Sequence, residues 1–289
     1  MEKKKRFIDH TIVALFIALM VFILGLIVTS VAFKLLFGDD TTPFNAFADM
    51  LATVIPAVVA MVVLKILYRK SYTSGLGFRG LIKGFKYVGI IFALTLVIFL
   101  VNFIGGARIP NDRNSILIAL IASASAGIFE ELMFRGIITS LLMRKCHKSV
   151  IGIFFAVIAS AAIFGLSHLA NVAAAGGLTT GILLQIGYAT ALGSVFGAAF
   201  VRSKNVWGCM VSHFVFDAGS FLFMNNSNGS SESLGQMLNQ QTSTMEFVFD
   251  IALMVVCVGA MIYLLRPSKI AEVKTLWAPK EDREEVFNS

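Results

Sequence analysis

Apolar residues occur along this chain in long blocks that short polar connections separate. Eight of these blocks are close to or above the length of about 20 residues that a helix needs to cross a bilayer. They cover residues 11–37, 44–68, 85–104, 115–143, 149–170, 179–202, 205–225 and 245–265. The pattern therefore predicts an all-α fold, a polytopic bundle of about eight transmembrane helices.

Composition supports a membrane protein. Of the 289 residues, 57% are hydrophobic and 14% are charged, whereas soluble domains carry about 25% charged residues. The first block, 11–37, is much longer than the apolar core of about 7–15 residues in a signal peptide, so we interpret it as a first transmembrane helix. The three cysteines are scattered and indicate neither a disulfide framework nor a metal site.

Basic residues concentrate in alternate connections between the blocks, for example from Arg69 to Lys86 and at Arg144, Lys145 and Lys148. The positive-inside rule then places both termini in the cytoplasm. The net charge of +7 thus indicates contact with membrane lipids and gives no reason to expect nucleic acid as a partner. Segment 71–86 is predicted to be an amphipathic piece in the cytoplasmic interface. Residues 1–270 are predicted to form one membrane domain, and residues 271–289 a charged cytoplasmic tail.

Three charged residues interrupt the block at 115–143: Glu130, Glu131 and Arg135. Charges at that depth cost several kcal/mol unless they are paired or functional. Glu131 and Arg135 are four residues apart, so they share a helix face and can form a salt bridge, whereas Glu130 points about 100° away. The row through Glu131 continues backwards through small residues, which favour close packing against another helix: Gly127, Ser123, Ala119 and Ser115.

Two later blocks carry further ionisable residues on faces with small neighbours. His168 lies at the end of block 149–170, and His213 and Asp217 share one face of block 205–225. Block 179–202 adds a close-packing face with Ala189, Gly193 and Gly197. Because a bundle interior seldom collects two glutamates, two histidines and an aspartate for packing alone, we interpret the set as a functional polar site.

Depth in the membrane constrains this site. Counted from the cytoplasmic side at about 1.5 Å per residue, Glu130 lies roughly 20 Å deep and His168 nearer 27 Å. The two can meet only if the helix carrying His168 is tilted, protrudes into the cytoplasm or breaks near Gly165.

These residue types suit hydrolysis of an amide bond. A carboxylate beside a neutral imidazole can hold a water and take its proton, while a second histidine with an aspartate or arginine stabilises charge on the attacked carbonyl oxygen. Two alternatives stay open. The same groups, Glu130, His168, His213 and Asp217, can act as zinc ligands, or they can form an ion pathway, although the two matching halves of a transporter are missing.

Three motifs occur in order along residues 115–225: Glu130-Glu131-x-x-x-Arg135, Phe164-x-x-x-His168 and His213-x-x-x-Asp217. Together they resemble the signature of the CAAX-processing and bacteriocin-processing (CPBP) intramembrane proteases, also called Abi or type II CAAX prenyl endopeptidase-like proteins. The resemblance implies that Glu130 and His168 activate water and that His213 acts as an oxyanion stabiliser or ligand.

The resemblance also implies supporting roles for Glu131, Arg135, Phe164 and Asn171. Asp217 occupies a position where some members of the family carry Asn. An ionised Asp repels an oxyanion, so Asp217 must orient His213, be protonated or bind a metal. No cofactor is certain, and zinc remains an alternative.

The sequence therefore predicts an endopeptidase in a cell membrane, of bacterial type given its small size and lysine-rich start, that cleaves a membrane-associated peptide or protein. The alternative is a non-catalytic immunity or scaffold membrane protein that binds a cell-envelope enzyme or toxin. In that case the Asn/Ser-rich loop 225–243 would be the contact for the partner. All motif residues are present, which favours catalysis.

Overall fold

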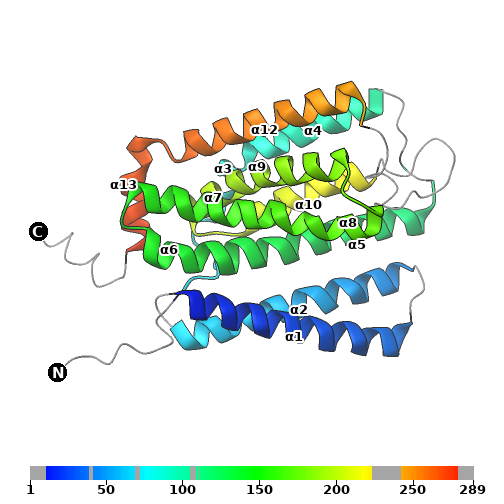
Figure 1. Ribbon diagram of the computed structural model, residues 1–289, viewed down its shortest axis with the longest axis horizontal. Helices are drawn as coiled ribbons and strands as arrows, with labels where there is room; N and C mark the ends of the chain where they lie inside the picture. The colour runs from blue at the N-terminus through cyan, green and yellow to red at the C-terminus, as the bar shows by residue number, and fades with distance from the viewer. Residues whose placement is uncertain are drawn as a thin grey trace, which may run out of the picture.

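The computed structural model describes residues 11–38, 42–68, 72–104, 109, 111–222 and 242–278. Every regular element in these ranges is a helix, which confirms the all-α prediction (Figure 1). The elements are α1 (Thr11–Phe37), α2 (Pro43–Tyr68), α3 (Leu81–Tyr87), α4 (Gly89–Ile104), α5 (Arg113–Glu131), the π-helix η3 (Leu132–Thr139), α6 (Ser140–Cys146), α7 (Val150–Ser167), the 3₁₀ helix η4 (His168–Ala170), α8 (Asn171–Ala175), α9 (Thr180–Ser203), α10 (Trp207–Phe221), α12 (Thr244–Leu264) and α13 (Pro267–Trp277).

Each of the eight predicted blocks contains a helix, but not all are equally long. Within the described residues, six helices are long and apolar enough to cross a membrane, and the bent pair α3–α4, with 48° between its halves, would make a seventh. Helix α10 has only 15 residues, short of the ~20 that span a bilayer. The chain is a multi-pass membrane protein, and the expected total of eight spans stays a prediction.

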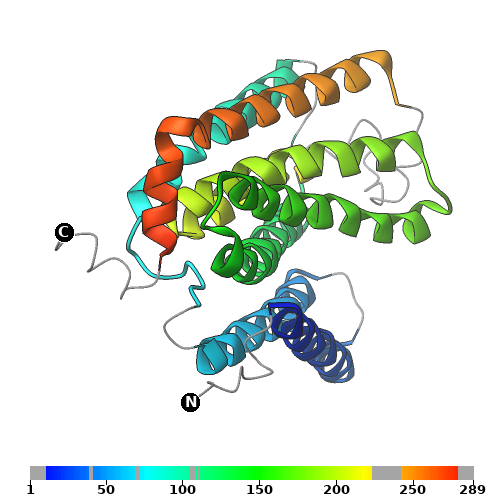
Figure 2. The ribbon, with the colours of Figure 1, turned by 60° about the vertical axis from the view of Figure 1, so that its left-hand side comes forward.

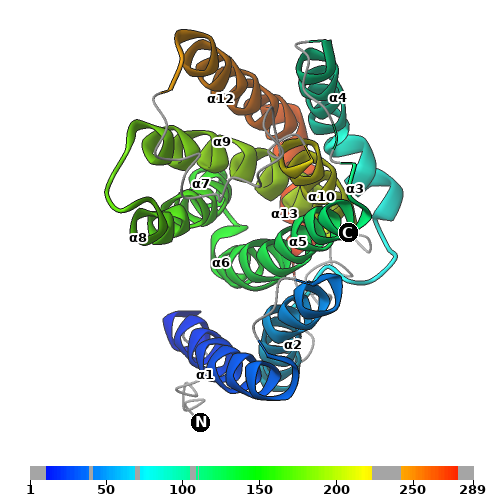
Figure 3. The same ribbon diagram turned by 90° about the vertical axis from the view of Figure 1, so that its right-hand side faces the viewer.

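The helices pack around α9, which lies between α7 and α12 (Figure 3). In α9, 72% of the most apolar stretch is buried, against 17% in α1 and 22% in α12. Helix α10 packs on α5, and α2 contacts α5 from the other side. Helices α1 and α2 form a hairpin at one side of the molecule (Figure 2). The core therefore follows α9, and the functional site is built around it.

Small residues let the central helices approach closely. A Cβ atom at Gly127 of α5 would lie 2.8 Å from the backbone nitrogen of Phe214 in α10. At Gly165 of α7 it would lie 2.6 Å from the carbonyl oxygen of Ile186 in α9. Real Cβ atoms do not approach backbone so closely, so both crossings depend on glycine. The close-packing face predicted for α5 is confirmed.

Polar side chains cap the N-termini of the helices that carry the site. The Asp112 carboxylate accepts a hydrogen bond from the Ser115 backbone N–H at the start of α5. The hydroxyls of Ser149 and Thr179 cap α7 and α9 in the same way. Each side chain satisfies an N–H group that the first helical turn leaves without a partner.

The segment before α3 differs from the amphipathic piece expected at 71–86. Residues 72–80 have no helix, since Gly75 and Gly80 take left-handed φ angles of 76° and 82°, and only the end of the segment forms α3. Much of the segment packs on the protein. The buried Tyr72 donates to the carbonyl of Gly136 at 2.7 Å, and the Asn205 side chain donates to the carbonyl of Gly77 at 2.7 Å.

The predicted tail at 271–289 also begins as packed structure. Helix α13 buries Ile270, Val273 and Trp277, and the Trp277 indole donates to the carbonyl of Val201 at 2.7 Å. The spacing of these apolar residues, three and then four apart, is that of an amphipathic helix. Residues 279–289 lie outside the described residues, as do residues 225–241 of the Asn/Ser-rich loop.

Candidate active site

A cavity of about 530 Å³ lies between α5, the α7–η4 junction, α9 and α10. All four residues predicted to be catalytic line it, namely Glu130, His168, His213 and Asp217. Phe164 and Asn171, predicted as supports, also line it. The structure thus brings together side chains from three separate segments of the chain.

His213 is the centre of the charged network. Its Nδ1 lies 3.0 Å from Glu131 Oε1, while its Nε2 lies 3.5 Å from both Glu130 Oε2 and Asp217 Oδ2. One ring nitrogen therefore faces the buried carboxylate behind the cavity, and the other faces the two carboxylates that line it. The contacts at 3.5 Å exceed the usual hydrogen-bond length, so they are electrostatic contacts and not direct hydrogen bonds.

The two adjacent glutamates occupy different environments. The Glu131 side chain is 0% exposed, and the Glu130 side chain is 22% exposed and lines the cavity. Glu131 Oε1 accepts a hydrogen bond from Arg135 Nη1 at 2.8 Å, which confirms the predicted salt bridge. Glu131 therefore belongs to the supporting network, and Glu130 is the carboxylate that a bound molecule can reach.

Arg135 is almost fully buried, and its charge is compensated on several sides. Besides Glu131, it donates from Nη2 to the carbonyl of Gly193 at 3.0 Å. Its guanidinium carbon lies 5.0 Å from the ring centre of Phe164 and 5.3 Å from that of Phe196. A carboxylate, a carbonyl and two aromatic faces together offset the cost of removing this cation from water.

The π-helix η3 begins directly after Glu131. Its wider turns leave carbonyl groups that other side chains bind. The carbonyl of Phe134 accepts hydrogen bonds from Thr139 and Ser160, at 2.8 and 3.0 Å, and the carbonyl of Gly136 accepts from Tyr72. Such π-helical turns are rare and concentrate at functional sites. No feature of the sequence predicted this π-helix.

His168 lies where α7 ends and the 3₁₀ helix η4 begins. The chain tightens here but continues as one candidate span, Val150–Ala173, so a break near Gly165, one of the three alternatives for bringing His168 to Glu130, does not occur. His168 Nδ1 lies 3.2 Å from the carbonyl of Phe164, so Nδ1 carries the proton that it donates, and the Nε2 lone pair is left to act as an acceptor. Farther along the chain, Asn171 donates to the side chain of Gln185 at 2.8 Å.

Aromatic rings fix the two imidazoles. Phe164 forms T-shaped contacts with His168 and His213, with ring centres 5.2 and 5.8 Å apart, and Phe196 stacks on His213 at 5.6 Å. Three residues at the site, Phe196, Gln185 and Tyr188, are not among those predicted from the sequence. A signal existed for Gln185, which lies four residues before Ala189 on the same row as the small residues of α9.

The zinc alternative stays a prediction. In the part of the chain that the structure describes, no group of three or more His, Cys, Asp or Glu side chains is placed to hold one metal ion. His213 Nδ1 is engaged by Glu131. The cavity instead offers a carboxylate, an imidazole with an available lone pair and a second imidazole among carboxylates, which suits acid–base chemistry on a bound water.

Comparison with known protein families gives a match over the segment that carries the site. Residues 112–219 match the family model described as Type II CAAX prenyl endopeptidase Rce1-like. The matched segment contains all three motifs and every side chain of the charged network. No curated protein matches the chain, and no solved structure matches it.

Proposed function

We propose that this chain is an intramembrane endopeptidase in which Glu130 activates the attacking water, a proposal supported by the match of residues 112–219 to the model of the Rce1-like type II CAAX prenyl endopeptidases. The family match implies an intramembrane endopeptidase of the CAAX type. One observation carries the assignment to Glu130. Of the two adjacent glutamates, it alone lines the cavity that also holds His168, His213 and Asp217.

The proposed reaction begins with a water held between Glu130 and the Nε2 of His168. Glu130 takes a proton as the water oxygen attacks the peptide carbonyl carbon, and the carbonyl oxygen gains the negative charge. His213, protonated among three carboxylates, donates to that oxygen. Glu130 then passes its proton to the leaving amine nitrogen, the C–N bond breaks, and the carboxylate is restored.

Asp217 acts through His213 in this scheme. Its Oδ2 lies 3.5 Å from His213 Nε2, so its negative charge favours the protonated ring that the oxyanion needs. An aspartate beside the oxyanion itself would oppose the reaction, because two negative charges repel. Asp217 therefore orients and charges His213.

The cavity wall suits an apolar peptide segment. Aromatic and aliphatic side chains line it beside the polar groups, including Phe129, Leu192, Phe216 and Phe221. A peptide that enters from the bilayer could bury its side chains there while its backbone reaches Glu130. We propose a membrane-associated peptide or protein as the substrate and a bacterial cell membrane as the location.

The test is Glu130→Gln, which keeps the shape of the side chain and removes its charge. Candidate membrane peptides are co-expressed with either protein, and new peptide termini in the membrane fraction are identified by mass spectrometry. We expect the cleavage rate to fall by about 10²–10⁴-fold. Asp49→Asn, which removes an exposed carboxylate from α2, serves as the matched control and should cleave at the original rate.

Cleavage that persists in Glu130→Gln would exclude the mechanism. If the unaltered protein cleaves nothing, and Glu130→Gln still captures a cell-envelope protein, the chain is instead a scaffold. Both variants need melting temperatures close to that of the unaltered protein, so that a folding defect is not taken for lost chemistry.

Metal removal tests the glutamate-type mechanism separately. Because no metal-holding group of side chains occurs among the described residues, we expect activity to persist after treatment with 1,10-phenanthroline or EDTA. Loss of activity that Zn²⁺ restores would show that the cavity rearranges around a metal and would contradict the proposal.

A further inference from the structure

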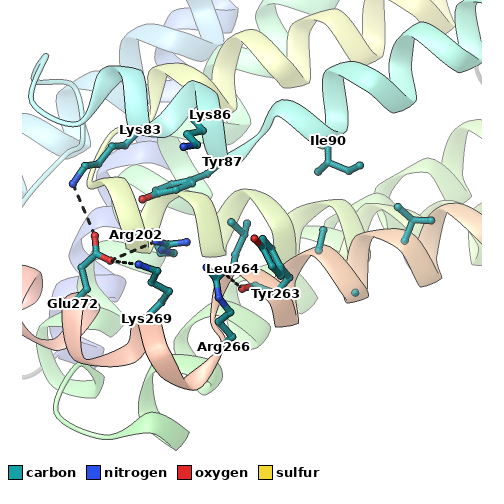
Figure 4. A pocket seen from close by; sticks show the side chains of 13 residues that line it. Lys83, Lys86, Tyr87, Ile90, Arg202, Tyr263, Leu264, Arg266, Lys269 and Glu272 are labelled. Carbon is teal, nitrogen blue, oxygen red and sulfur yellow. Dashed lines mark hydrogen bonds and ion pairs between the residues drawn. The ribbon is translucent and has the colours of Figure 1, made fainter.

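A second cavity, of about 740 Å³, lies where α3, α9, α12 and α13 meet at one end of the bundle (Figure 4). Five cationic side chains and one carboxylate line it: Lys83, Lys86, Arg202, Arg266, Lys269 and Glu272. We refer to it as the basic cavity. It contains none of the residues that line the candidate active site.

Arg202 is the buried member of this set, with a side chain that is 6% exposed. Its guanidinium carbon lies 4.2 Å from the ring centre of Tyr87, and Nη2 lies 3.5 Å from Glu272 Oε2. Its Nε–H has no hydrogen-bond partner within the described ranges. A buried donor without an acceptor costs about 1–3 kcal/mol. An acceptor oxygen on a bound ligand would remove that cost.

Glu272 does not neutralise the basic cavity. It lies 3.5 Å from Arg202, 3.6 Å from Lys269 and 3.9 Å from Lys83, so a single carboxylate is shared among three cations (Figure 4). Lys86 and Arg266 form no ion pair with any residue that the structure describes. Cations gathered in this way repel one another, and a bound anion would remove that repulsion.

The wall beside the cations is apolar and continues onto the surface of the membrane-spanning helices. Ile90 of α4 and Val256 of α12 line the cavity and are each 40% exposed. Tyr263 stands at the same edge, and its ring lies 4.2 Å from the Arg266 guanidinium. An aromatic residue with a polar tip, beside cations and an apolar face, is typical of the level of lipid headgroups.

From this combination we propose that the basic cavity binds the phosphate headgroup of an anionic phospholipid, whose acyl chains lie along α4 and α12. Phosphate oxygens supply the acceptors that the cations and the Arg202 Nε–H lack, and basic pockets between membrane helices suit such headgroups. A soluble phosphate compound would satisfy the cations but would leave the apolar wall without a partner. The bound lipid links α3 and α4 to α12 and α13.

The experiment places the full-length protein in nanodiscs with equal amounts of phosphatidylglycerol and phosphatidylcholine, extracts it in mild detergent and counts retained lipids by native mass spectrometry. We expect phosphatidylglycerol to be retained about tenfold or more over phosphatidylcholine. The variant Lys86→Ser/Lys269→Ser should lose most of that preference. Lys145→Ser/Lys148→Ser removes the same charge from exposed positions after η3 and should keep it.

Equal losses in the two double variants would mean that general surface charge holds the lipid, and the proposal would be wrong. It would also be wrong if phosphatidylglycerol were not preferred by the unaltered protein. A final arm uses inorganic phosphate at millimolar concentration. If phosphate raises the melting temperature as much as phosphatidylglycerol does, the ligand is a soluble phosphate compound and the lipid assignment fails.

Discussion

The two cavities hold charge in opposite ways, although α9 lines both. In the candidate active site, Glu131 contacts both Arg135 and His213, and aromatic rings cover the arginine and the histidine. In the basic cavity, one carboxylate serves several cations at 3.5–3.9 Å. Among the described residues each network leaves buried atoms without a hydrogen-bond partner, namely Glu131 Oε2 and Arg135 Nε in the first and Arg202 Nε in the second, but only the second has far more cations than carboxylates.

The difference follows from the access of water. A charge inside the bundle must find its partner within the protein, because an isolated buried ion costs several kcal/mol. A lysine at the end of the bundle can be solvated by water, so it does not need a partner within the protein and is available to a ligand. We therefore expect the folded chain to fix the geometry of the candidate active site. We expect the occupancy of the basic cavity to depend on the lipid composition of the membrane.

The sharpest test of this difference removes one cation from each charged network. Arg135→Met leaves the buried Glu131 carboxylate without its partner, and we expect a loss of about 3–5 kcal/mol in the free energy of unfolding. Lys86→Met removes an exposed cation and should change that free energy by about 0.5 kcal/mol or less. Chemical unfolding in detergent micelles, followed by circular dichroism, measures both.

The double variant Arg135→Met/Glu131→Gln provides the control. It removes the stranded charge and should recover part of the lost stability without recovering activity. If Arg135→Met and Lys86→Met destabilise the protein equally, the contrast between the cavities is wrong.

A second comparison uses one glycine from each cavity region. Gly127→Ala puts a Cβ atom 2.8–2.9 Å from backbone atoms of α10, so α5 and α10 must separate. We expect a cost of about 1–3 kcal/mol. Gly259→Ala, in α12 beside the basic cavity, meets nothing within 4 Å and should be neutral or gain up to about 1 kcal/mol of helix propensity. Equal melting temperatures for the two variants would show that the crossing of α5 and α10 is looser than described.

The smallest effect concerns the start of α5. Hydrogen bonds from the backbone N–H and hydroxyl of Ser115 lower the pKa of Asp112 below its ordinary value. A lowered pKa in the folded state adds stability above the unfolded value of about 3.9 and loses it as the pH falls through the folded value. The melting temperature of Asp112→Ala should therefore fall below that of the unaltered protein at pH 7, and the gap should narrow toward pH 3.

Ser149→Ala is the control for this pH dependence, because the Ser149 hydroxyl caps α7 but does not titrate. Its effect on the melting temperature should be the same at both pH values. If the difference in melting temperature between Asp112→Ala and the unaltered protein did not change with pH, the charge of the Asp112 carboxylate would not be the cause of the stabilisation.

The sequence predicted those features that follow from hydropathy and helical spacing. Apolar length located the helices, and the spacing of four residues identified the pairing of Glu131 with Arg135 and the close-packed face through Gly127. The cost of charge inside a membrane predicted that Glu130, His168, His213 and Asp217 share a site, and they line one cavity. The catalytic roles of these residues stay predictions for the experiments above.

Other features depend on contacts that spacing does not encode. Phe196 is one of 26 phenylalanines, and nothing local marks it as the ring that stacks on His213. The cations of the basic cavity come from segments as far apart as Lys83 and Lys269, and each looked like an ordinary basic flank of a helix. The packing of Trp277 was not predicted either, because the charged residues around it in α13 indicated a solvated tail.

The π-helix has a consequence for how relatives of this chain should be aligned. A π-helical turn accommodates one residue more than the α-helical turn it replaces. A related protein with a regular α-helix after its paired glutamates is therefore expected to show a one-residue gap between positions 132 and 139. Its equivalents of Tyr72 and Ser160 would then have no free carbonyl to bind, so the gap and the loss of these hydroxyls should occur in the same sequences.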